Sequence, residues 1–136
     1  MLFGFEWDLS SPLAFAISIL PILLTGMVVT IQATVLGFLV ALVLGLVWAV
    51  LKAAPSRLIS WPATLVTEFI RDTPLLVQLF FLYYVLPEFG ILLPAFMTGA
   101  LALGLQYSAY TSEVYRAGIE AVGPDQREAA RALNLS

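Results

Sequence analysis

The sequence predicts an all-α membrane protein, and three observations lead to that fold class. Of the 136 residues, 61% are hydrophobic and only 11% are charged, whereas soluble domains carry roughly 25% charged residues. No charged residue lies between Asp8 and Lys52, a stretch long enough to cross a bilayer as a helix. The mean hydropathy of the chain is +0.98. We therefore expect residues 1–136 to form a single transmembrane domain.

Proline, glycine and charged residues divide the sequence into predicted spans. A bilayer core about 30 Å thick takes roughly 20 helical residues. On that measure we place three membrane spans at about 22–51, 70–87 and 92–115. A cytoplasmic segment follows at 116–136. Pro12 and Pro21 precede the first span, as points where a lead-in segment can break from the helix.

The start of the second span is left open. An early start places Glu68 and Arg71 inside the membrane, whereas a start near Thr73 leaves them at the cytosolic surface. Thr73 followed by Pro74 favours the later start, because Thr is a good N-cap and Pro suits the first helical position. Glu68, Arg71 and Asp72 then form a solvated cluster of charges at the interface.

The basic residues predict the orientation. The segment before the first span and the turn around Glu88 contain no Lys or Arg, whereas the 52–72 segment and the tail contain three each. Basic residues stay on the cytoplasmic side of short loops. The N-terminus is therefore expected outside, and residue 136 in the cytoplasm.

Small residues recur four apart in two of the predicted spans. They are Gly37, Ala41 and Gly45 in the first span and Ala100, Gly104 and Ser108 in the third. Such stripes let helices approach closely in lipid, so both spans are expected to pack against other helices. The alternative is that small residues are simply abundant in transmembrane helices.

The third span also has a polar face. Gln106, Tyr110 and Glu113 follow helical spacing and share one side. Polar groups at membrane depth usually face a bundle interior or a water-filled path, so these residues are candidates for a translocation path. For Gln106 and Tyr110 an interhelical hydrogen bond is the other role. Glu113 has the alternative of an ordinary pair with Arg116.

Enzymatic chemistry is disfavoured by composition. The chain has no Cys and no His, which removes the commonest nucleophile, general base and metal ligands. Glu68 and Glu113 are isolated carboxylates and do not make an acid/base pair. A net charge of -3 without a basic patch argues against nucleic-acid binding. We expect no catalytic residue, no metal site and no cofactor.

The tail predicts a short cytoplasmic helix over 123–134. Pro124 suits its first position and Asn134 its C-terminal stop. Charged residues cover most of this helix, and Ala129 with Leu133 gives it a small apolar edge. A helix of this kind is a candidate for docking into a groove of a partner protein.

Residues 68–78 read EFIRDTPLLVQ, and residues 128–130 read EAA with an Asn at 134. These two motifs resemble those of permease subunits of bacterial ATP-binding-cassette importers of the polar amino-acid branch. The first is similar to the signature E-x-x-R-G-T-P-L-L-V-Q, with Asp72 in place of the usual Gly. The motif positions that match are Glu68, Arg71, Thr73, Pro74 and Gln78.

The second motif is the cytoplasmic E-A-A-x-x-x-G loop, which couples the permease to the ATPase in that family. Glu128, Ala129 and Ala130 match it, and Asn134 stands where the family has Gly. Asn is the next best residue at a left-handed helix end. Pro124 lies one place later than in the family's common V-P-x-G-Q.

The resemblance implies a type I importer permease fold, also called MetI-like, with five helices and the N-terminus outside. This chain corresponds to the first three helices and the start of the coupling loop, so we expect it to be C-terminally incomplete. The subfamily that Arg71 to Leu135 most resembles imports ectoine and hydroxyectoine.

The same resemblance implies function and partners. The chain is expected to be a permease subunit of the bacterial inner membrane that translocates a small zwitterion, ectoine or hydroxyectoine first and polar amino acids second. Its partners are cytosolic ATPase subunits, an extracytoplasmic binding protein, a second permease subunit and membrane lipid. ATP is hydrolysed on the separate ATPase, so the chain is not itself an enzyme. The alternative is a scaffold or accessory membrane subunit that does not transport.

Overall fold

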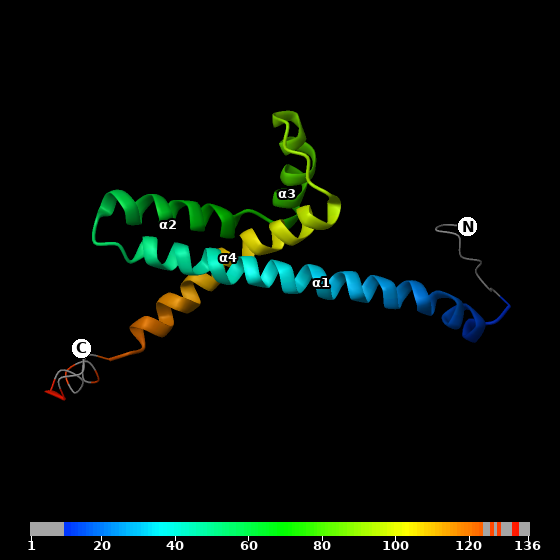
Figure 1. The fold of residues 1–136 in the computed structure, drawn as a ribbon, viewed down its shortest axis with the longest axis horizontal. Helices are drawn as coiled ribbons and strands as arrows, with labels where there is room; N and C mark the ends of the chain where they lie inside the picture. The colour runs from blue at the N-terminus through cyan, green and yellow to red at the C-terminus, as the bar shows by residue number, and fades with distance from the viewer. Residues whose placement is uncertain (1–9, 124–125, 127, 129–131, 134–136) are drawn as a thin grey trace.

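The computed structural model describes residues 10–123, 126, 128, 132 and 133, and all regular structure in these residues is helical. Its helices are α1 (Pro12–Lys52), α2 (Arg57–Asp72), α3 (Leu75–Phe80) and α4 (Ala95–Glu120) (Figure 1). A π-helical turn at Phe81–Val85 and a 3₁₀ turn at Leu86–Phe89 extend α3. The predicted all-α fold class is confirmed.

The helix α1 is much longer than the first predicted span. Its 41 residues rise about 62 Å at 1.5 Å per residue. The Ser11 hydroxyl caps its start by accepting from the amide of Ala14 at 3.1 Å, and Pro12 takes an early position where its missing N–H costs little. The helix continues through Pro21 without the break considered from sequence, because transmembrane helices tolerate an interior proline.

The bend between α2 and α3 divides the second predicted span. Within the described residues, α1 alone is long and apolar enough to cross a membrane, and α2 with the α3 segment reaches that measure only as a pair bent by 100°. The range 70–87 falls across this bend, and 92–115 begins just ahead of α4. The membrane limits of all three spans remain predictions.

The bend, which we call the elbow, is centred on Thr73 and Pro74 and includes the adjoining helix ends, from Glu68 of α2 to Gln78 of α3. Pro disfavours helical geometry in the residue before it, and Thr73 accordingly has extended dihedrals (φ -85, ψ 122). The helix α3 begins at Leu75 with Pro74 as its cap residue, so the predicted N-cap role of Thr73 is wrong. The Thr73 hydroxyl instead donates to the carbonyl of Phe69 at 2.7 Å and completes the last turn of α2.

The core lies between α1 and α4 and is built from small residues. Gly37, Ala41 and Gly45 are buried against the buried stripe Ala100, Gly104 and Ser108, and a Cβ placed on Gly104 would lie 2.5 Å from Val40 Cγ1. The two backbones therefore approach closely, as the small-residue stripes predicted.

The arrangement places α4 in contact with every other helix. It crosses α1 obliquely, and α2 runs back alongside the C-terminal part of α1, while α3 stands away from both (Figure 1). The described part of the tail follows α4 away from this bundle. The polar side of α4 consequently faces the elbow.

Candidate functional site

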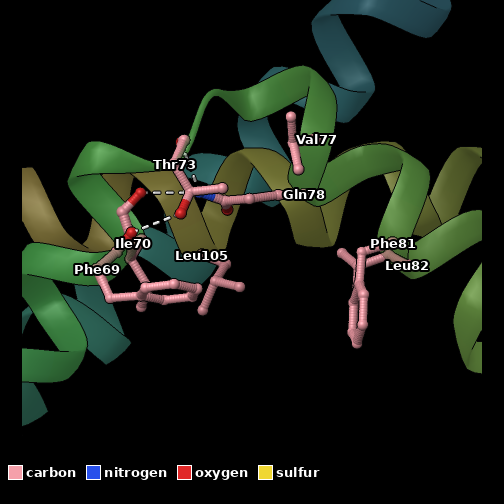
Figure 2. A pocket seen from close by; sticks show the side chains of 8 residues that line it. All are labelled: Phe69, Ile70, Thr73, Val77, Gln78, Phe81, Leu82 and Leu105. Carbon is pink, nitrogen blue, oxygen red and sulfur yellow. Dashed lines mark hydrogen bonds between the residues drawn. The ribbon is translucent and has the colours of Figure 1, made fainter.

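Gln78 on α3 holds the elbow together. Its amide nitrogen donates to the carbonyl of Ile70 at 2.8 Å and to that of Thr73 at 3.2 Å. Carbonyls at a helix C-terminus lack intrahelical partners. The Gln78 amide therefore supplies the hydrogen-bond donor that the next turn of an unbroken helix would have supplied. Figure 2 shows its side chain extended from α3 toward Thr73 and Ile70. The side chain is 8% exposed.

Gln106 connects α4 to the elbow. Its Oε1 accepts a hydrogen bond from the Gln78 amide nitrogen, and both residues are buried. This is the interhelical hydrogen bond considered for Gln106 from sequence. The Gln78 Oε1 atom is buried and accepts no hydrogen bond from the described residues. A displacement of α4 along its axis would therefore either move the elbow or break the hydrogen bond between Gln78 and Gln106.

We predict that Gln78→Leu in the complete permease lowers the free energy of unfolding by about 2 kcal/mol or more, because it removes the donor to the carbonyls of Ile70 and Thr73 and to Gln106. The measurement is the thermal midpoint of the purified protein in detergent. Gln32→Leu is the matched control, since Gln32 is an exposed residue of α1. Equal midpoints for the two variants would contradict the role assigned to Gln78.

Arg71 lies over α4 at the end of α2. Its guanidinium carbon is 5.4 Å from the centroid of the Tyr110 ring, a cation–π distance. The nearest carboxylate of the described residues is Glu68, with 3.8 Å between nitrogen and oxygen. The structure thus brings one motif residue, Arg71, to one candidate path residue, Tyr110, with a second motif residue, Glu68, beside Arg71.

Glu113 joins α4 to the end of α1. Its Oε1 bonds to Lys52 Nζ, and its Oε2 accepts from Arg116 at 3.0 Å. The pair with Arg116 expected from sequence is confirmed. Arg116 also contacts Glu120 at 2.8 Å, and hydrogen bonding to Glu113 raises the pKa of Arg116 further above its ordinary value. The role of Glu113 in a path remains a prediction.

Sequence reasoning gave no functional role to Lys52, which reads as a basic residue in a cytoplasmic loop. In the structure its side chain is only 7% exposed. The partner is 61 residues away in sequence, so no local spacing rule can identify it. Its place at the end of a long uncharged stretch was the one available signal.

The coupling motif is described in part. Glu128 is exposed, whereas Ala129, Ala130 and Asn134 lie outside the described residues. The predicted contact of this segment with an ATPase is consequently a proposal that rests on sequence. No group of three or more potential ligands for a metal ion is present among the described residues.

Two cavities flank the Gln78 and Gln106 pair. One of about 370 Å³ has almost entirely apolar walls, from Phe69 and Ile70 of α2 to Phe81 and Leu105 (Figure 2). The other, of about 410 Å³, is lined by Leu75, Gln106, Tyr107 and Tyr110. The second presents more polar surface than the first, in which Thr73 and Gln78 are already hydrogen-bonded, and a polar solute requires such surface.

Close packing through small residues and polar groups buried between helices are typical of helical membrane proteins. The comparison with known proteins identifies the family. Residues 41–136 match the family described as binding-protein-dependent transport system inner membrane component, and the chain belongs to this family. The MetI-like fold class predicted from sequence is thereby confirmed.

The relatives are permeases of amino-acid transporters. A probable amino-acid ABC transporter permease protein of Sinorhizobium fredii is 65% identical, over 99% of this chain and 59% of its own length. The arginine transport system permease protein of Bacillus subtilis is 37% identical, over 85% of this chain and 53% of its own. The chain therefore spans about half the length of the curated relatives it matches.

A solved structure resembles this one closely. It is a crystal structure of an amino acid ABC transporter with histidines, with a TM-score of 0.80 and 40% sequence identity. The match covers 89% of this chain and 56% of that one. At this identity the likeness supports the arrangement of the helices.

Proposed function

We propose that this chain forms the first helices of a permease subunit that carries amino acids across the bacterial inner membrane in an ATP-driven importer. The observation that carries the proposal is the polar face of α4, where Gln106 and Tyr110 meet the elbow and Arg71. Polar groups gathered between helices at membrane depth favour a path for a polar solute.

The partners are proposed from the family. They are cytosolic ATPase subunits, an extracytoplasmic binding protein and a second permease subunit, the same chain or a sister chain. ATP binding would move the segment around Glu128 and bias the helices between outward-facing and inward-facing states, a two-state equilibrium. The N-terminus is proposed outside and the tail in the cytoplasm, as the basic residues predict.

The proposed substrate is an amino acid, with ectoine second. The sequence resemblance ranked ectoine and hydroxyectoine first, but the relatives reported above are named for amino acids, among them arginine. The part of the path face around Gln106 and Tyr110 carries one charge of each sign, on Arg71 and its partner Glu68. A small zwitterion suits that balance of charge.

The test is uptake by the complete permease, reconstituted in vesicles with its ATPase and binding protein. Labelled glutamine, arginine, cystine and ectoine are compared, and we expect ATP-dependent uptake of at least one amino acid. In the same assay Glu128→Lys should lower uptake by roughly tenfold while ATP hydrolysis continues. Glu88→Lys makes the same charge change in an exposed turn and should have no effect.

The outcomes separate the alternatives. Uptake of ectoine alone would overturn the ranking of substrates. Normal uptake by Glu128→Lys would contradict the coupling role of that residue. A complete and assembled complex that hydrolyses ATP and takes up none of these solutes would favour the scaffold.

A further inference from the structure

The charged end of α2 lies beside the C-terminal half of the predicted first span. The helix α2 starts at Arg57, just after Lys52 ends α1, and runs back alongside it (Figure 1). Between Arg57 and Arg71 it rises roughly 21 Å. If α1 crosses the membrane over 22–51, Arg71 is at membrane depth, where an ionisable residue is costly and usually serves a ligand or ion.

Arg71 has donors that the described residues do not use. Its Nε is buried and donates no hydrogen bond to any of them. The 3.8 Å separation from Glu68 exceeds hydrogen-bonding distance, and the contact with the Tyr110 ring orients the guanidinium without occupying its N–H groups. The exposed part of the side chain is its terminal end. A planar, oriented guanidinium whose two terminal nitrogens keep free N–H groups fits a carboxylate, which it binds through two parallel hydrogen bonds.

Glu68 supplies the opposite charge next to it. The two side chains are 55% and 36% exposed for Glu68 and Arg71, so a solute can reach both. A free amino acid carries a carboxylate and an ammonium group in the reverse arrangement. Tyr110 belongs also to the wall of the 410 Å³ cavity, which gives the remainder of such a solute a polar space beside the pair.

We infer that Arg71 binds the carboxylate of the transported amino acid and that Glu68 binds its ammonium group. This inference rests on the proposed function and adds to it the groups that recognise the substrate within the membrane. When the amino acid binds, two charge-assisted pairs replace the 3.8 Å contact between Arg71 and Glu68. One pair joins Arg71 to the carboxylate and the other joins Glu68 to the ammonium group. Tyr110 is a positioning residue in this site, because it orients the guanidinium of Arg71.

The test is equilibrium binding to the complete permease assembled with its ATPase, in detergent and without the binding protein. Labelled arginine is compared with agmatine, the amine that remains when arginine loses its carboxylate. Labelled glutamine is compared in the same way with the amine that remains when glutamine loses its carboxylate. Arg71→Gln should weaken amino-acid binding about 10- to 100-fold. Each amino acid and its corresponding amine should then bind with about equal affinity. Glu68→Gln should weaken the binding of both ligands in each pair.

Two further variants keep the experiment decisive. Arg71→Lys keeps the charge but loses the planar fork, so it should bind the amino acid more weakly than the unchanged protein and still prefer it to the amine. Arg57→Gln makes the same charge change at the exposed start of α2 and should bind normally. Assembly with the ATPase shows that each variant folds.

The inference is overturned if Arg71→Gln, or Arg71→Lys where the first variant does not assemble, binds amino acid with unchanged affinity and preference. That result leaves the proposed function intact, since the unchanged protein still binds. If the unchanged complex binds and transports no amino acid, the proposed function fails, and the inference fails with it.

Discussion

Replacing Gly104 with leucine is expected to separate α1 from α4 and to be the most damaging single change in the core. A Cβ at this position would already lie 2.5 Å from Val40 Cγ1 and 2.7 Å from Val40 Cβ. Because those atoms belong to a branched side chain next to its backbone, they have little freedom to move aside. The larger leucine side chain can be accommodated only if the helices separate.

The expected loss in the free energy of unfolding is about 3 kcal/mol, the upper end for overpacking a core. The measurement is the thermal midpoint of the complete permease in detergent, with the fraction of monodisperse protein as a second readout. Gly99→Leu is the matched control, because it changes the same residue type on the same helix where nothing lies within 4 Å of an added Cβ. Similar midpoints for the two variants would refute the close-packing argument.

Reversing the charge of Lys52 is the second change with a large expected effect. Lys52→Glu places a carboxylate next to Glu113 in a site where the lysine side chain was 7% exposed. The pair is part-buried, so breaking it is expected to cost about 3 kcal/mol, the lower end for buried pairs, because an uncompensated charge remains. The end of α1 should then separate from α4 just before the coupling segment, so uptake should fall together with the thermal midpoint.

A double-variant cycle distinguishes pairing from general damage. Glu113→Lys in the Lys52→Glu background should recover part of the lost stability, since the pair is restored with its signs exchanged. Recovery is partial because Arg116 loses Glu113 as a partner and keeps only Glu120. Arg57→Glu, at an exposed residue of the same cytoplasmic end, is the control. The pairing is refuted if the double variant is no more stable than Lys52→Glu.

Together these contacts suggest how motion would pass through the subunit. The α1 and α4 helices are in contact from Gly37 through Gly45 to Lys52, and Gln106 bonds α4 to Gln78 of the elbow. A displacement of the coupling segment would therefore move α1 and α4 together and change the elbow. The elbow carries the proposed substrate groups Glu68 and Arg71.

The helical fold class and the packing stripes could be predicted because they depend on local composition. A long uncharged apolar stretch requires helices in a bilayer, and glycine or alanine every fourth residue marks a contact face whatever the partner. The pair between Glu113 and Arg116 was likewise accessible, since the two residues are three apart on one helix.

The identity and periodicity of these faces follow from the amino-acid sequence, as do the motifs that relate the chain to its family. Which faces meet depends on the packing of the helices in three dimensions. It joined Gln78 to Gln106, placed Lys52 against Glu113 and set Arg71 over the Tyr110 ring. At Thr73, where the sequence predicted the start of a helix, the structure has a bend between two helices. The physical reason is that each of these features depends on how a broken helix folds back on residues far away in sequence, and neither propensity nor spacing contains that information.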